Sequence, residues 1–280
     1  MNTALSLRSI LERTSLPSNE ARILMAFILD KHYQLPRSAV LSRDDLALHE
    51  VALKEWLELE SKRLAGQPIA YLIGKKGFHN IELEVAPGVL IPRPETELLV
   101  EIGLQHLKQS DASCKVLDLG TGSGAIALAI AHEHQNAVVT ATDQSEEALA
   151  IAKRNAEILG LQSRIVFEQG SWYEALKPEH RFDIILSNPP YIAKEDPHLL
   201  LGDLRFEPLS ALTDHAEGLN CLKAIISGAP AYLQQNGLIA VEHGYDQSDA
   251  VVALMQLAGF TKIQTHQDLA GHQRVVSARK

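Results

Sequence analysis

Hydrophobic residues in the first quarter of the chain recur at spacings of three and four, as Leu7, Ile10 and Leu11 illustrate. This spacing is typical of amphipathic helices. We expect about four helices between Leu5 and Leu72, with Ser18 or Asn19 as a possible cap of the second. The expected breaks fall at Leu16-Pro17-Ser18, Leu35-Pro36 and Gly66-Gln67-Pro68. The pattern predicts a small helical domain over residues 1–75.

The pattern then changes to the alternation of a half-buried strand, with Ile81, Leu83 and Val85 on one face. Pro87-Gly88 is a turn signal, and Val89–Ile91 is a short apolar run. These features predict a β-hairpin that turns at Pro87-Gly88. We interpret residues 76–92 as a connector.

After Pro92, short apolar runs alternate with segments of helical periodicity. Nearly continuous apolar strands that alternate with helices are typical of a parallel sheet covered on both faces. Residues 93–280 are therefore predicted to form a doubly wound, mostly parallel, Rossmann-like α/β domain. Strands are expected at 115–119, 137–142, 165–168, 182–187, 238–242, 261–265 and 275–278, and helices at 125–134, 146–159, 219–235 and around Met255.

Composition narrows the range of partners. The chain has 26 Lys+Arg against 35 Asp+Glu, a formal net charge of -9, so nucleic acid is a disfavoured partner. The two cysteines, Cys114 and Cys221, show no paired spacing and fit reduced thiols. Met1–Ile10 lacks the apolar core of a signal peptide, and no apolar run is long enough to span a membrane. We therefore expect a soluble, cytoplasmic protein with no membrane partner.

A glycine-rich loop, Gly120-Thr121-Gly122-Ser123-Gly124, joins the first strand of this domain to a helix. Unpaired N–H groups at a helix start predict a small polar ligand there. The loop also satisfies a dinucleotide fingerprint, and Asp143 lies where a ribose-binding acid is expected in either case. Asp118 favours a ligand with cationic centres and no phosphate, which describes S-adenosyl-L-methionine.

The fourth strand of the domain ends in Asn188-Pro189-Pro190-Tyr191. In a doubly wound sheet the first and fourth strands are neighbours, which would set Asn188 beside the methyl donor. The Asn188 side-chain oxygen and the Pro189 carbonyl could accept hydrogen bonds from an amide or aryl-amine nitrogen and free its lone pair. The prolines fix these acceptors, and Tyr191 could lie against the flat substrate group. The motif thus predicts methylation of a planar nitrogen.

These motifs, together with Arg93-Pro94-Glu95-Thr96-Glu97 and Arg205-Phe206-Glu207-Pro208, resemble the release factor glutamine N5-methyltransferases, the PrmC/HemK family. The resemblance covers nearly the whole chain. It implies methylation of the glutamine in the Gly-Gly-Gln motif of class-1 peptide chain release factors, which the N-terminal helical domain would help to grip.

By the same resemblance, a set of residues binds the donor: Asp118, Gly120, Thr121, Gly122, Ser123, Gly124, Asp143, Trp172 and Asn188. Asn188, Pro189, Pro190 and Tyr191 would hold the glutamine amide, with Asn188, Pro189 and Tyr191 as the catalytic residues. Family members often have Asp before the aromatic residue, where this chain has Ser171. A serine hydroxyl or a backbone group would then contact the adenine amine.

Several alternatives stay open at this stage. Asp143 could cap a helix, although Ser145 is the better cap candidate, and Trp172 could be a buried hydrophobe. Arg93–Glu97 could be only a helix start, and Glu242-His243-Gly244 either lines the pocket or only ends a strand.

A nucleic-acid exocyclic-amine N-methyltransferase would use the same Asn-Pro-Pro-Tyr motif. Two further hypotheses for the function are a donor-binding module without catalysis and a nicotinamide dehydrogenase. The twelve histidines show no metal-ligand spacing, so no metal is expected.

Overall fold

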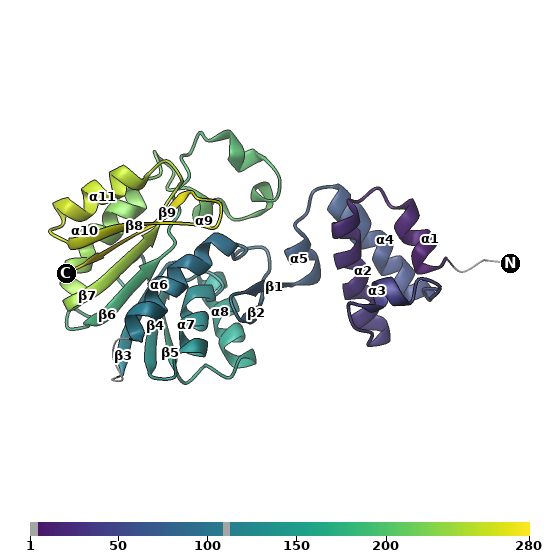
Figure 1. Ribbon diagram of the computed structural model, residues 1–280, viewed down its shortest axis with the longest axis horizontal. Coiled ribbons are helices and arrows are strands. Elements are labelled where there is room, and N and C mark those ends of the chain that lie inside the picture. Colours follow the sequence, from purple (N-terminus) through teal and green to yellow (C-terminus); the bar gives the residue numbers. More distant parts are fainter. Residues whose placement is uncertain (1–4, 109–112) are drawn as a thin grey trace. The chain divides into compact units, whose positions relative to one another are not determined.

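A computed structural model describes residues 5–108 and 113–280. The chain divides into two compact units, Met1–Gly74 and Lys75–Lys280, each with its own helices or sheet (Figure 1). The first four residues of the segment in which we expect no signal peptide lie outside the described residues. None of the helices in the described ranges is both long enough and apolar enough to cross a bilayer.

The first unit is helical, as predicted, but contains one more helix than expected. The breaks at Pro17, Pro36 and Pro68 fall between helices, as the sequence indicates. The cap prediction is wrong: Pro17 occupies the N-cap of the second helix without a side-chain hydrogen bond, and Ser18 is already helical. The helices are α1 (Leu7–Arg13), α2 (Ser18–Tyr33), α3 (Ala39–Ser42), α4 (Glu50–Leu64) and α5 (Ile69–Ile73).

This unit has a hydrophobic core of its own, in which Leu24, Ile28 and Trp56 are almost fully buried. Each such side chain contributes on the order of 1.5–3 kcal/mol when it leaves water. Arg63 on α4 binds both oxygens of Glu20 on α2, with N–O distances of 2.7 and 2.8 Å. A separate core and a bidentate ion pair make the unit an independent packing module.

The second unit begins with the predicted hairpin, but its turn lies elsewhere. Strand β1 (Lys75–Phe78) pairs with β2 (Ile81–Glu84), and the turn is at His79 and Asn80. Ile81 and Leu83 are buried on one face of β2, as predicted. A turn does form at Pro87-Gly88, as predicted, but it does not close the hairpin, and the prediction of a strand at Val89–Ile91 is wrong. Phe78 supplies the buried partner on the preceding strand, and Pro87 has no N–H to donate to a ladder.

The core of the second unit is a seven-stranded sheet with the order β5-β4-β3-β6-β7-β9-β8. Strands β3 to β7 are parallel in the sheet, whereas β9 is antiparallel to both β7 and β8. The chain winds outward from β3 and then returns to place β6 beside it. This confirms the predicted doubly wound, mostly parallel fold. The strands are β3 (Cys114–Leu119), β4 (Ala137–Asp143), β5 (Ile165–Gln169), β6 (Phe182–Ser187), β7 (Leu233–Glu242), β8 (Thr261–Gln267) and β9 (Gln273–Arg279).

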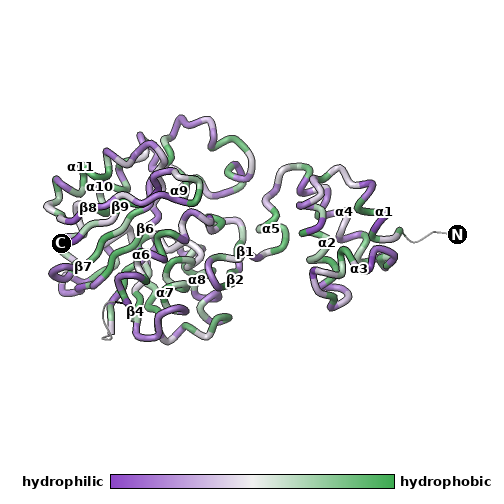
Figure 2. The backbone as a smooth tube through the Cα atoms, in the orientation of Figure 1, coloured by the Kyte–Doolittle hydropathy of each residue, from purple (hydrophilic) through white to green (hydrophobic). Residues whose placement is uncertain are grey.

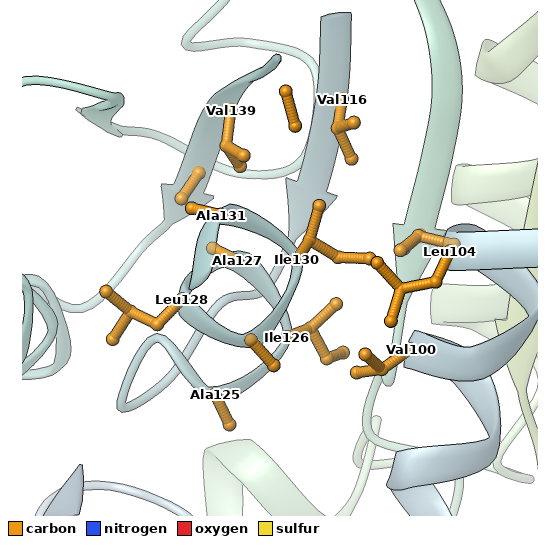
Figure 3. Packing of buried hydrophobic residues seen from close by; sticks show 14 of the residues in the cluster. Val100, Leu104, Val116, Ala125, Ile126, Ala127, Leu128, Ile130, Ala131 and Val139 are labelled. Atoms are coloured by element: carbon orange, nitrogen blue, oxygen red, sulfur yellow. The ribbon is translucent and has the colours of Figure 1, made fainter. Parts of the chain in front are cut away.

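Helices pack on both faces of this sheet. Figure 3 shows Ile130 of α7 between Val116 of β3 and Leu104 of α6, in the cluster that fills one face. The other face packs against α10 and α11. In Figure 2 the central strands β6 and β7 run largely through hydrophobic positions, which agrees with their burial on both sides, whereas the edge strand β8 is hydrophilic and largely exposed. These helices are α6 (Glu97–Leu107), α7 (Ala125–Glu133), α8 (Glu146–Ile158), α10 (Asn220–Tyr232) and α11 (Ser248–Leu257).

The segment between β6 and α10 has short helical turns in place of a long crossover helix. It contains η2 (Pro197–Leu200), η3 (Leu204–Phe206) and α9 (Leu209–Leu212), and one further turn, η1 (Pro94–Thr96), precedes α6. A parallel bridge joins Ile192 to Thr213 and ties the two ends of this segment together. The segment is therefore a long loop whose two ends are joined, and it lies at the carboxyl ends of the strands, where ligands bind in such sheets.

Candidate active site

The glycine loop connects β3 to α7 with backbone conformations that favour glycine. Gly120 has a φ of 73° and Gly124 a φ of 87°. A Cβ on Gly120 would come within 3.2 Å of the Trp172 ring, and one on Gly124 within 2.7 Å of Leu128. Side chains at these positions would push the loop away from Trp172 and from α7.

Several amides of the loop are held by hydrogen bonds to the protein, whereas those of Ser123 and of the first residues of α7, Ala125 and Ile126, are not among them. The amides of Gly120 and Thr121 both donate to the Thr142 carbonyl at 2.9 Å. The Gly122 amide donates to Asp143 Oδ2 at 2.9 Å, and the Gly124 amide turns back to the Thr121 carbonyl. The bonded amides of Gly120, Thr121, Gly122 and Gly124 are not available as donors to a ligand.

Asp118 lies beneath the loop and is completely buried. Its Oδ2 accepts hydrogen bonds from the Thr121 hydroxyl at 2.6 Å and from the Ala127 amide at 3.2 Å. Burial raises the pKa of this carboxyl to about 7, and the two hydrogen bonds oppose the shift. Asp118 therefore stabilises the loop through these two buried hydrogen bonds. Its predicted contact with a cationic ligand stays a prediction.

Asp143 ends β4 and faces the pocket. Besides holding Gly122, it accepts the Ser145 amide on Oδ1 at 2.9 Å. The helix cap is Ser145, whose hydroxyl accepts from the Ala148 amide, as anticipated for the better cap candidate. Burial raises the pKa of Asp143, and the backbone N–H groups oppose this shift. Each carboxylate oxygen has two lone pairs, so both can accept a further hydrogen bond from a ligand hydroxyl.

The Asn-Pro-Pro-Tyr motif follows β6, next to the loop after β3. Asn188 Nδ2 donates to the Thr96 hydroxyl oxygen at 2.9 Å, while Pro189 is buried. The Tyr191 hydroxyl donates to Glu242 Oε1 at the end of β7, 3.1 Å away. Tyr191 thus packs into the protein on the side of β7, and its predicted contact with a substrate stays a prediction.

Glu242 is buried, and burial raises its pKa to about 7. The Tyr191 hydroxyl hydrogen-bonds this carboxylate and, together with the Thr96 hydroxyl, opposes the shift. Sequence reasoning weighed Glu242-His243-Gly244 only as a pocket wall or a strand end. Its hydrogen bond with Tyr191 links the end of β7 to the Asn-Pro-Pro-Tyr motif.

A buried ion pair joins two segments that the sequence singled out only by resemblance. Arg93 pairs with Glu207, whose side chain is fully buried, and the second Glu207 oxygen accepts the Ile91 amide at 3.0 Å. Burial raises the pKa of Glu207, and Arg93 acts against it. Arg93–Glu97 is therefore more than a helix start, because it anchors the segment between β6 and α10.

These elements surround one pocket of about 240 Å³. Of the predicted donor residues, the glycine loop up to Ser123, Asp143, Trp172 and Asn188 line it, and so does Pro190. Ser171 lines it too, beside Trp172, which suits the expected contact with an adenine amine. Sequence reasoning missed the walls formed by residues on either side of the Arg93–Glu207 pair: Val89, Leu90, Pro208, Ser210, Ala211, Thr213, Asp214 and His215.

Comparison with known proteins identifies the class. Residues 95–203 match the methyltransferase small domain family, and residues 6–74 match the PrmC N-terminal domain family. A 16S rRNA methyltransferase of T. thermophilus, solved with AdoMet and guanosine, shares the fold at a TM-score of 0.54. It is 23% identical, over 74% of this chain and 49% of its own. The fold is that of an S-adenosylmethionine-dependent methyltransferase.

Full-length relatives identify the family. A release factor glutamine methyltransferase of Bordetella pertussis is 47% identical over 269 residues, 96% of this chain and 97% of its own. One from Burkholderia pseudomallei is 44% identical over 274 residues, 96% of this chain and 94% of its own. The chain belongs to the release factor glutamine methyltransferase family, which confirms the resemblance drawn from its motifs.

Proposed function

We propose that this protein transfers a methyl group from S-adenosyl-L-methionine to the side-chain amide nitrogen of the glutamine in the Gly-Gly-Gln motif of class-1 release factors, in the cytoplasm. The observation that carries the proposal is the position of Asn188. It lines the same pocket as the glycine loop and Asp143, because β6 lies next to β3 in the sheet.

The pocket fits a donor with cationic centres better than a dinucleotide. Four of the five loop amides, those of Gly120, Thr121, Gly122 and Gly124, are already bonded within the protein, and the acidic Asp143 lines the pocket. The arginine of the lining, Arg93, is paired with Glu207. Pyrophosphate would be repelled by the Asp143 carboxylate, whereas a sulfonium and an ammonium group would be favoured. This argues against the nicotinamide dehydrogenase.

Different residues of the chain would contact the two ligands, the methyl donor and the glutamine amide. Asp143 would accept hydrogen bonds from the ribose hydroxyls, and Trp172 would lie against the adenine. S-adenosyl-L-methionine supplies an electrophilic methyl group. The Asn188 side-chain oxygen and the Pro189 carbonyl would orient the two N–H bonds of the glutamine amide and favour the pyramidal nitrogen that has a free lone pair. No strong base is needed, because the methylated nitrogen readily loses its extra proton.

We assign substrate recognition to the helical unit, residues 1–74. Four large hydrophobic side chains of this unit are more than half exposed: Leu41, Val51, Leu57 and Leu64. Exposed apolar side chains of this size suit contact with a protein partner better than contact with a polyanion. The net charge of -9 points the same way, and nucleic acid is a disfavoured substrate.

The second candidate is methylation of an exocyclic amine in nucleic acid, because Asn-Pro-Pro-Tyr serves that chemistry equally well. A transfer assay with labelled donor separates the two, using purified release factor, tRNA and duplex DNA in parallel at low salt. We expect label in the release factor alone. Label in either nucleic acid, with none in the release factor, would overturn the proposal. Donor binding without transfer to any of them would identify a binding module.

A further inference from the structure

Gln247 stands at the N-cap of α11, yet its side chain does not cap that helix. The residues favoured at an N-cap, such as Ser, Asn and Asp, have a short side chain whose oxygen accepts an N–H group of the first turn. The longer side chain of Gln247 makes hydrogen bonds to three other segments of the chain in place of such a bond. Helix capping therefore does not account for a glutamine at this position.

Both ends of the Gln247 carboxamide are used. Its Oε1 accepts the amide of Gly244, which follows β7, at 2.8 Å. Its Nε2 donates to the Tyr191 carbonyl at 3.0 Å and to the Gly218 carbonyl at 3.3 Å. A backbone amide can only donate and a carbonyl can only accept, so a carboxamide turned over about its last bond would lose all three hydrogen bonds. The three backbone partners thus fix the orientation of this side chain.

The Tyr191 carbonyl is held closely between Gln247 and Gly218. Gly218 precedes α10 and has a φ of 84°. A Cβ on Gly218 would lie 2.3 Å from the Tyr191 carbonyl oxygen and 2.9 Å from Gln247 Nε2. Such a close approach requires glycine. Gln247 therefore joins the start of the segment between β6 and α10 to its end, and joins both to the turn after β7.

The part of the chain that Gln247 holds is the end of the Asn-Pro-Pro-Tyr motif. The two prolines of the motif have no N–H group, so its middle cannot be anchored by amide donors of its own. Its start is anchored by Ser187, whose hydroxyl donates to the Leu119 carbonyl at 2.7 Å. Because φ is fixed at both prolines, a shift of the Tyr191 backbone is passed on to the Pro189 carbonyl.

We propose that Gln247 is a positioning residue, which holds the Tyr191 carbonyl and thereby keeps the Pro189 carbonyl directed at the substrate amide. Gln247 does not line the pocket and acts through the backbone of the Asn-Pro-Pro-Tyr motif. This inference rests on the proposed function of that motif.

Gln247→Met tests the role, because methionine has a similar length and volume but can make none of the three hydrogen bonds as they stand. A misplacement of about 1 Å can cost about a hundredfold in rate. The single-turnover rate at saturating donor and release factor should therefore fall about 10- to 100-fold, while the Kd for S-adenosyl-L-methionine changes less than about threefold. Gln256→Met, the same change at an exposed position of α11, should keep the rate. Circular dichroism and urea unfolding check that each variant is folded in the assay.

Gln247→Glu separates positioning from a loss of packing. Its carboxylate can still accept the Gly244 amide but has no hydrogen for the Tyr191 carbonyl. Two facing carbonyls should raise the pKa of this glutamate, and protonation returns one donor. The rate of Gln247→Glu relative to wild type at the same pH should therefore rise as the pH falls from about 8 to about 5.5. The corresponding ratio for Gln247→Met should stay constant.

A wild-type rate for Gln247→Met would overturn the inference, and so would a ratio for Gln247→Glu that does not change with pH. A loss confined to donor affinity would also overturn it. If the wild-type protein leaves the glutamine of the release factor unmethylated, the proposed function itself fails, which distinguishes the two failures.

Discussion

Replacing Asp143 tests whether the acid at the end of β4 binds the donor or only shapes the loop. In the protein it accepts the amides of Gly122 and Ser145, each at 2.9 Å, and it faces the pocket. Asp143→Ala removes both contacts and any hydrogen bonds to the ribose. If Asp143 only shapes the loop, its replacement should lower stability alone. If it also binds the donor, the replacement should lower donor affinity as well.

The expected size follows from the type of bond lost. Hydrogen bonds to a charged acceptor contribute about 1.5–3 kcal/mol. Loss of the ribose contacts should thus weaken donor binding by about 10- to 150-fold. Loss of the backbone contacts should in addition lower the stability of the donor-free protein by a similar free energy. The chemical step, measured at saturating donor, should remain close to wild type.

Two measurements separate these effects: calorimetric titration with S-adenosyl-L-methionine, and denaturant unfolding without it. Asp183→Ala is the matched control, because Asp183 also accepts a backbone amide, that of Lys115 at 2.8 Å, but does not line the pocket. The control should lose stability and keep its affinity. An Asp143→Ala protein with unchanged affinity would assign Asp143 to the loop alone and refute the reasoning.

Further predictions concern the chemistry, the domains and the pH dependence. Asn188→Ala should lower the single-turnover rate about a hundred- to a thousandfold with a much smaller effect on donor affinity, and loss of donor binding alone would contradict its role. Deletion of residues 1–74 should preserve donor binding by calorimetry and a folded circular dichroism spectrum but sharply reduce methylation of intact release factor, whereas a full rate would refute the gripping role. Asp118 has a folded-state pKa of about 7 against an ordinary 3.8, so its contribution to stability is complete below about pH 4 and is lost as the pH rises through 7. Asp118→Asn should therefore flatten the fall in unfolding free energy between pH 5 and 7, by up to about 1.4 kcal/mol per pH unit, and equal slopes in urea titrations would contradict this.

The sequence allowed prediction of the features that depend on local pattern. The periodicity around β3, α7, β4 and α8 predicted elements that the structure places within a residue or two. The glycine loop and Asn188 could be brought together because the winding rule of such sheets puts β3 beside β6. In these cases one rule connects a short segment to its place in the fold.

Features that depend on pairing between distant segments were not predicted. Lys75–Phe78 lacks a clear strand pattern, yet it is the partner of β2, with Phe78 in the core of the second unit. Val89 and Ile91 are equally buried without forming a strand. The pair of Arg93 and Glu207 joins residues 114 positions apart. The opposite charges in these two motifs were the available signal for it. Without another observation, any of the chain's many acids could have been the partner.

The hydrogen bond from Asn188 to Thr96 illustrates the same limit at the site itself. The sequence indicated which chemical groups a planar nitrogen needs, but not what holds them, because Thr96 precedes Asn188 by 92 positions. For Glu242, the sequence indicated only that it lies at the end of a strand, and its hydrogen-bond partner could not be predicted. The orientation of a functional group is set by its buried neighbours, and those are known only once the strands are placed.

The most direct test of the account is to locate the methyl group. A class-1 release factor is incubated with the protein and S-adenosyl-L-methionine, digested, and analysed by tandem mass spectrometry. The account predicts a single added methyl on the side-chain nitrogen of the Gly-Gly-Gln glutamine, strongly reduced with the Asn188→Ala protein. A methyl group on any other residue, or an unmodified glutamine after incubation with donor-bound wild-type protein, would contradict it.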